Sequence, residues 1–208
     1  MAKFTTPTRA RAIRNEFGID KDDVLSGNVA TLTNEIKGQE YLIRAMPHII
    51  KVFPTARLLL IGDGPSESYF VEIIKSLNFR ERVILTGFRK DIPELVNILD
   101  LYVHPSLTEG LSIAVIEAMF LKKPVIATRV DGLPEVVVEN QTGYLVPSKD
   151  AESIAKAVID LLGNREKMRQ MGEAGFKRAE AKFTPDVIVK ELEALYRGLS
   201  CKIHPKSQ

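Results

Sequence analysis

The chain has 208 residues, 45% of them hydrophobic and 27% charged, so it can form a packed core and is neither disordered nor fibrous. Its 29 basic and 27 acidic residues leave a formal net charge of +2. The two signs are interspersed along the sequence, which indicates no nucleic-acid partner. A single cysteine, Cys201, excludes an internal disulfide framework and a thiolate metal site.

Targeting signals are missing from the sequence. No apolar run approaches the roughly 18 residues of a membrane span, and the first twenty residues lack the apolar block of a signal peptide. We therefore expect a cytoplasmic protein. Peripheral contact with the inner face of the membrane, through Lys3, Arg9, Arg11 and Arg14, is a less favoured alternative to an ordinary solvated helix face.

Short runs rich in Val, Ile and Leu alternate with longer amphipathic segments, a pattern typical of βαβ units and a parallel sheet. We predict strands near residues 27–32, 57–62, 82–86, 100–104, 124–128 and 142–146. We predict helices near residues 8–17, 38–53, 66–77, 91–98, 110–122, 151–162, 165–182 and 185–199. The sequence thus predicts an α/β fold with a doubly wound, Rossmann-like open parallel sheet of about six strands. One domain spans residues 1–199, and a disordered tail follows at 200–208.

Ligands of such sheets bind at the carboxyl ends of the strands, so the loops there are the candidate sites. The first of these loops delivers Lys37 to a helix start, where a lysine opposes the helix dipole unless an anion binds there. A solvated lysine is the alternative. In the second loop, Gly62 and Gly64 resemble the start of a dinucleotide fingerprint, but Glu67 stands where a third glycine is needed. A nicotinamide site is therefore a weak hypothesis, and a tight turn before a helix is the simpler explanation.

The third loop carries Gly87, Phe88 and Arg89, whose backbone offers a surface for a flat heterocycle. Asp91, with Glu94 three residues later, has the spacing of a capping box, so we expect these two acids to be structural.

The fourth loop is the most informative, because Glu109 and Glu117 flank a stretch suited to a phosphate. Gly110 lets a ligand approach the N–H groups of Gly110, Leu111 and Ser112 at the start of a helix. Glu117 follows in an apolar part of that helix, so we expect it to be buried and to need a partner.

His104 ends the strand before this loop. We expect it to be structural, because no second histidine is placed to share a metal ion. No cluster with metal-ligand spacing occurs near the site, so we expect no metal.

Five motifs occur in an order and at a spacing that resemble the donor-binding, C-terminal domain of retaining glycosyltransferase family 4, the group-1 transferases with the GT-B fold. The likeness covers about residues 3–197. The motifs are Val29-Ala30-Thr31-Leu32 with Lys37-Gly38-Gln39, Gly62-Asp63-Gly64-Pro65, Thr86-Gly87-Phe88-Arg89, Pro105-Ser106 with Glu109 and Glu117, and Gly132-Leu133-Pro134-Glu135 with Gly143-Tyr144-Leu145-Val146-Pro147.

The resemblance implies a role for each candidate residue. Glu109 would bond hydroxyls of the donor sugar, and the amides of residues 110–112 would hold the diphosphate. Lys37 would stabilise charge on the departing nucleoside diphosphate without a metal or a cofactor. Glu117 would hold the ribose hydroxyls, and the backbone of residues 88–89 would contact the base.

The same resemblance implies what this chain lacks. Thr31 stands where the family commonly has an arginine. The chain begins near the family's domain boundary, so we expect the acceptor-binding N-terminal domain to be absent and the chain to be inactive alone. A stand-alone nucleotide-sugar binding or regulatory module without turnover is the alternative. Apolar surface on the last helix then leaves room for self-association, around Val187, Ile188, Leu192 and Leu195.

Overall fold

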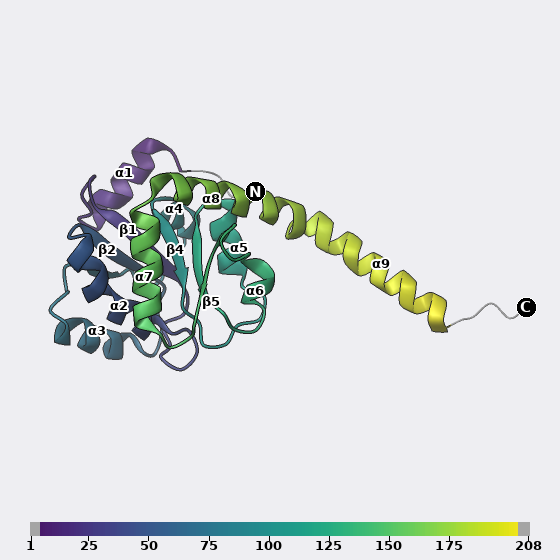
Figure 1. The fold of residues 1–208 in the computed structure, drawn as a ribbon, viewed down its shortest axis with the longest axis horizontal. Helices are drawn as coiled ribbons and strands as arrows, with labels where there is room; N and C mark the ends of the chain where they lie inside the picture. Colours follow the sequence, from purple (N-terminus) through teal and green to yellow (C-terminus); the bar gives the residue numbers. More distant parts are fainter. Residues whose placement is uncertain (1–4, 204–208) are drawn as a thin grey trace, which may run out of the picture.

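The computed structural model describes residues 5–203, with side chains as far as residue 197. Six parallel strands form one sheet in the order β3-β2-β1-β4-β5-β6, with helices on both faces (Figure 1). The strands are β1 (Val24–Val29), β2 (Ala56–Ile61), β3 (Val83–Leu85), β4 (Leu101–His104), β5 (Val125–Thr128) and β6 (Gly143–Val146). The helices are α1 (Pro7–Glu16), α2 (Gln39–Val52), α3 (Glu67–Ser76), α4 (Ile92–Asn97), α5 (Ile113–Phe120), α6 (Leu133–Val136), α7 (Ala151–Leu162), α8 (Arg165–Lys182) and α9 (Pro185–Ile203).

The predicted fold class is confirmed, and the strand order is that of the doubly wound dinucleotide-binding sheet. Several elements differ from the sequence-based prediction. Strand β1 begins three residues earlier, α5 is shorter than the predicted helix at 110–122, and the short helix α6 was not predicted. Helix α9 runs to Ile203, past its predicted end at residue 199. The rest of the predicted tail, residues 204–208, and Lys3 lie outside the described residues.

Side-chain caps explain where three helices begin. Thr6 accepts a hydrogen bond from the backbone N–H of Arg9, and Pro7 takes the first position of α1, where its missing N–H costs nothing. Asp150 caps α7 and Asn164 caps α8 in the same way. These caps satisfy N–H groups that the first turn of a helix leaves without partners.

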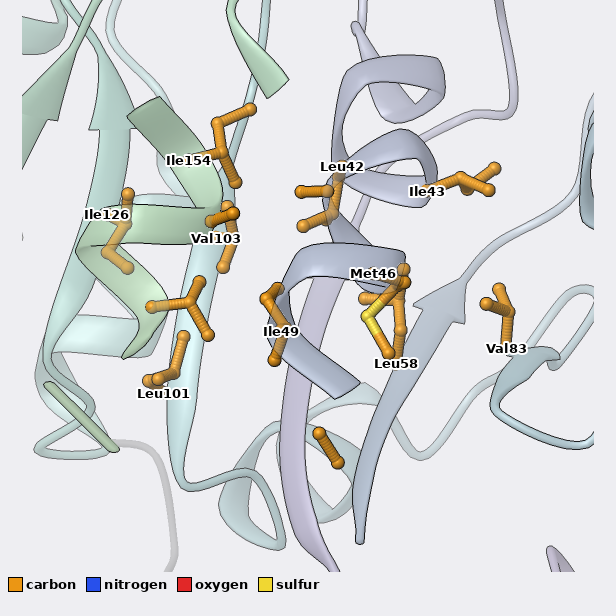
Figure 2. Close-up of a cluster of buried hydrophobic side chains, with 14 of the residues drawn as sticks. Leu42, Ile43, Met46, Ile49, Leu58, Val83, Leu101, Val103, Ile126 and Ile154 are labelled. Carbon is orange, nitrogen blue, oxygen red and sulfur yellow. The ribbon is translucent and has the colours of Figure 1, made fainter. Parts of the chain in front are cut away.

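The core has two layers, one on each face of the sheet. On one face, α2 and α7 pack against the strands, and their side chains meet those of the sheet (Figure 2). The labelled side chains in that layer include Leu42, Met46 and Ile49 of α2, Leu58 of β2, Val103 of β4, and Ile154 of α7. On the other face, α4 and α5 cover the strands. Burial on both faces explains why most strand residues are apolar and do not alternate with polar ones, although β1 also buries Ser26 and Asn28.

Helix α9 extends away from the body of the protein (Figure 1). Ile188, Leu192 and Leu195 are 38%, 46% and 57% exposed, and Val187 is half-buried. Residues four and three apart lie on one side of a helix, so these side chains form an apolar stripe. Within residues 5–203, no helix combines the length and the apolarity needed to cross a bilayer.

Candidate functional site

The site forms where the strand order reverses, between β1 and β4. Strands β1 and β4 are neighbours in the sheet, and the connection after each leads to a different face. In open α/β sheets, ligands bind in the crevice outside the carboxyl ends of the strands at such a reversal. The loop after β1 carries Lys37, and the loop after β4 carries Glu109. Both residues were predicted site residues, and the topology brings their loops together.

Close backbone contact holds the two loops against each other. The backbone N–H of Leu107 donates to the carbonyl of Ile36 at 2.7 Å. Gly38 has φ of 64°, and a Cβ at this position would overlap the carbonyl oxygen of Pro105. Only glycine adopts this left-handed conformation without strain and permits this approach. The contact places Lys37 beside the loop after β4.

Lys37 and Glu109 form an ion pair, with Nζ 2.8 Å from Oε2. The same oxygen also lies 2.9 Å from Nε2 of His104 and 3.1 Å from the hydroxyl of Ser106. Hydrogen bonds from His104 and Lys37 outweigh the opposing effect of burial and lower the pKa of Glu109 to about 2. The Glu109 side chain is 14% exposed, so an ionised carboxylate faces the crevice at neutral pH.

His104 belongs to this cluster, which the sequence analysis did not foresee. The His104 side chain is 2% exposed, and its Nε2 lies 2.9 Å from Oε2 of Glu109 and 3.2 Å from the Ser112 hydroxyl. The sequence analysis expected His104 to be structural and did not predict its contact with Glu109. The sequence feature that could have indicated this contact is the position of His104 at the end of a strand, five residues before Glu109.

Three backbone N–H groups lie next to the carboxylate. The N–H of Glu109 is taken by Asp131 at 2.9 Å, whereas those of Gly110, Leu111 and Ser112 donate to no residue in the described range. These three residues form a loop before α5 rather than its first turn, because the helix begins at Ile113. The predicted anion site therefore consists of free loop amides just ahead of a helix N-terminus.

Glu117 differs from its prediction. It lies in α5 but is exposed, so the expectation of a buried carboxylate is wrong. The helix buries Val115, Ile116, Ala118 and Met119 instead and turns Glu117 outward. No ion pair or hydrogen bond joins its carboxylate to another described side chain, and partial desolvation raises its pKa. Glu117 is thus available to a ligand.

The glycines of the second loop pack against the first. Side chains at Gly62 and Gly64 would collide with the backbone carbonyls of Ala30 and Leu32. The backbone N–H of Leu32 also donates to the carbonyl of Asp63 at 2.8 Å. Close packing of the two loops therefore accounts for both glycines, in agreement with the simpler explanation by a tight turn. Contact of these glycines with a ligand stays a prediction.

The third loop presents Phe88, whose side chain is 68% exposed, beside an immobilised Arg89. The Arg89 guanidinium pairs with Glu16 of α1 and with Asp91. Asp91 also binds Arg9, so the predicted capping box is wrong: Asp91 makes no side-chain cap to α4. Two arginines bind the Asp91 carboxylate, because hydrogen bonds from charged donors are stronger than one from a helix N–H.

Within the described residues, no group of three or more His, Cys, Asp or Glu side chains has the arrangement of a metal site. The crevice instead combines one ammonium, one ionised carboxylate, three free amides and an exposed second carboxylate. Cations and free amides suit a phosphate, and carboxylates suit sugar hydroxyls.

Comparison with known proteins defines the class. Residues 10–178 match the model of the family described as glycosyl transferases group 1, and the chain belongs to this family. It is 30% identical over 184 residues to N-acetyl-alpha-D-glucosaminyl L-malate synthase of Bacillus anthracis, covering 88% of this chain and 48% of that protein. It is 34% identical over 185 residues to a GDP-mannose-dependent alpha-(1-6)-phosphatidylinositol monomannoside mannosyltransferase of Mycolicibacterium smegmatis, covering 83% of this chain and 47% of that protein.

Solved structures agree with the GT-B, Rossmann-like architecture. Anabaena Alr3699/HepE, solved with UDP, superposes with a TM-score of 0.83 at 26% identity, covering 94% of this chain and 53% of that one. A C-terminal domain of a group 1 family protein, LpcC from Francisella tularensis, shares the fold with a TM-score of 0.76 at 23% identity, covering 88% of this chain and 96% of that one. The chain spans about half the length of the curated relatives it matches.

Proposed function

We propose that this chain is the donor-binding half of a retaining glycosyltransferase. It would bind a nucleoside diphosphate sugar and, with an acceptor-binding domain across the crevice, transfer the sugar to an acceptor hydroxyl. The observation that carries the proposal is the placement of Lys37 and the ionised Glu109 beside the free amides of residues 110–112. That arrangement offers positive charge for a diphosphate and a carboxylate for sugar hydroxyls within one crevice.

The diphosphate end of the donor would occupy the amides of residues 110–112, with Lys37 on the β-phosphate. As the bond between the anomeric carbon and the β-phosphate oxygen breaks, negative charge grows on the leaving diphosphate. Lys37 and fixed N–H dipoles stabilise this charge without reorganisation, which is how preorganised donors accelerate such a step. This role requires no metal ion.

The sugar and the nucleoside would lie on either side of the diphosphate. Glu109 accepts hydrogen bonds from sugar hydroxyls, and the exposed, unpaired Glu117 accepts from the two ribose hydroxyls. The base would lie against residues 87–89. Phe88 is exposed there, while Arg89 is held by two carboxylates, so the backbone and the phenyl ring are the available contacts.

The identity of the base is tested first with UDP, because the HepE neighbour was solved with UDP and with UDP-glucose. GDP follows, since a relative is GDP-mannose-dependent by name. Titration calorimetry of the 208-residue chain with UDP, GDP and ADP should show at least one binder. If none of the three binds, the proposed function is wrong.

The site is then tested by substitution. Glu117→Ala should weaken binding of that nucleotide by about tenfold, because two hydroxyl contacts to a charged group are lost. Glu72→Ala is the matched control, since Glu72 is a 70% exposed glutamate on α3, and its loss should leave affinity unchanged. Equal affinity in Glu117→Ala and the parent would contradict the ribose assignment.

A second candidate is a stand-alone nucleotide-sugar binding or regulatory module without turnover. In this alternative the nucleotide-sugar site would bind its ligand without passing the sugar to an acceptor. The two candidates differ when an acceptor-binding domain is supplied as a separate chain. Donor turnover that appears on mixing favours the transferase, and unchanged donor favours the module.

A further inference from the structure

The two oxygens of the Glu109 carboxylate differ in their hydrogen bonds. Its Oε2 atom accepts from three donors: Lys37 Nζ at 2.8 Å, His104 Nε2 at 2.9 Å and the Ser106 hydroxyl at 3.1 Å. Its Oε1 atom accepts from no side chain or backbone group in the described part of the chain. One oxygen is therefore fixed by the protein, and the other is left to a ligand.

The three donors differ in how firmly they are held. The Lys37 side chain is 27% exposed on a flexible stem, and a bound diphosphate would draw it away from the carboxylate. The His104 ring is 2% exposed. It stacks on Tyr102, with ring centroids 6.1 Å apart and planes 17° from parallel. Tyr102 is fully buried and its hydroxyl lies 3.2 Å from the Val29 N–H, so His104 rests on a rigid part of β4 and β1.

The environment of the ring also selects where its proton lies. Nδ1 is buried and has no partner among the described residues, whereas Nε2 lies 2.9 Å from Oε2 of Glu109 and 3.1 and 3.2 Å from the hydroxyls of Ser106 and Ser112. A proton on Nδ1 would be a buried donor without an acceptor, which is costly. A proton on Nε2 has a charged acceptor at 2.9 Å, so the Nε2–H tautomer is favoured.

We propose that His104 is a positioning residue that orients Glu109 by donating from Nε2 to Oε2, so that Oε1 is presented to a hydroxyl of the donor sugar. This inference rests on the proposed function and deepens it. His104 touches neither the sugar nor the diphosphate. We expect its effect at the sugar end: Nε2 also lies 3.2 Å from the Ser112 hydroxyl, but the proposed phosphate site uses the backbone N–H of Ser112 and not this hydroxyl.

The test compares a nucleotide with its sugar conjugate in three forms of the chain. In His104→Gln, the amide N–H₂ sits near the Nε2 position and still donates. In His104→Leu, the side chain fills similar space but donates nothing. The readout is the Kd for UDP-glucose divided by the Kd for UDP, with GDP-mannose and GDP as the second pair.

The expected result is selective. In His104→Leu, the ratio of the two Kd values should rise about tenfold, because Glu109 loses the hydrogen bond that orients it toward the sugar. The Kd of the nucleotide without its sugar should stay within about twofold of the parent value. His104→Gln should keep the parent ratio. A fall in affinity for both ligands alike, or a ratio that does not move, overturns the inference and leaves the proposed function intact. If no nucleotide binds the parent chain, the proposed function fails and this inference fails with it.

A second measurement needs no substitution, in case the leucine variant does not fold. The chain has three histidines, so the ring nitrogens of His104 can be assigned by NMR. We expect the Nε2–H tautomer in the parent protein. An Nδ1–H tautomer would show that His104 does not donate to Glu109 and would overturn the inference.

Discussion

Glu109→Gln tests the electrostatics of the site through the free energy of unfolding. The fall in the Glu109 pKa from 4.5 to about 2 corresponds to at most about 3 kcal/mol, at about 1.36 kcal/mol for each pH unit. Lys37 is partly solvated, so we discount this to about 1–2 kcal/mol. At pH 7 the variant should be less stable than the parent by this amount.

The direction in which stability changes with pH follows from the lowered pKa of Glu109. A carboxylate whose folded pKa is lower than its unfolded pKa stabilises the protein above pH 4.5, and this contribution is lost as the pH falls through about 2. More than half of the stability gap between parent and variant should therefore vanish between pH 7 and pH 3. Urea unfolding at both pH values measures it.

The matched control is Glu173→Gln, which breaks the half-exposed ion pair with Lys122. A surface pair contributes little, so this variant should stay within about 0.5 kcal/mol of the parent. A Glu109→Gln variant as stable as the parent at pH 7, or a stability gap that does not shrink at pH 3, would refute the account of the charged cluster.

Further expectations concern the loop, the metal, turnover and association. Asp131, at φ of 42°, accepts through one oxygen from both the Glu109 N–H and the Thr108 hydroxyl, so Asp131→Asn should keep nucleotide affinity and Asp131→Gly should lower it several-fold in calorimetry. Equal affinities in these two variants would show that the oxygen is not needed. Excess chelator should leave nucleotide affinity unchanged, and a large loss would mean that the phosphate site needs a metal ion. The chain assayed by itself should transfer no sugar in a product assay, because the proposed function gives an acceptor-binding domain the task of holding an acceptor hydroxyl within about 3–3.5 Å of the anomeric carbon; robust transfer would contradict this. Light scattering should detect self-association through the α9 stripe, and Leu192→Glu should abolish it; a monomer at all concentrations would contradict the expectation.

The sheet was predictable because its strands are largely buried on both faces and consist mainly of apolar residues, although β1 also carries Ser26 and Asn28. The runs at β2 and β5 indicate this directly, and the alternation with helices fixes the parallel topology. The loops that carry Lys37 and Glu109 follow from that topology, since ligands of such sheets bind where the strand order reverses.

The contacts inside the site were less accessible to sequence reasoning. Lys37 and Glu109 are 72 residues apart, and their pairing depends on the approach of Gly38 to Pro105, which no local pattern encodes. The Asp91 capping box failed because two arginines bind the carboxylate: Arg89, two residues away, and Arg9, which is 82 residues away. Glu117 was expected to be buried because its neighbours are apolar, but residues four apart share one side of a helix, and Glu117 lies on the same exposed side of α5 as Ile113.

The central claim is that a nucleoside diphosphate binds between Lys37 and the amides of residues 110–112. A crystal structure of the chain with UDP tests it most directly, with GDP or ADP in its place if calorimetry selects one of them. We expect diphosphate oxygens about 3 Å from the N–H groups of Gly110 and Leu111 and from Lys37 Nζ. A diphosphate bound instead at the amino-terminal ends of the strands, in the basic pocket lined by Lys21 and Arg165, would contradict the account.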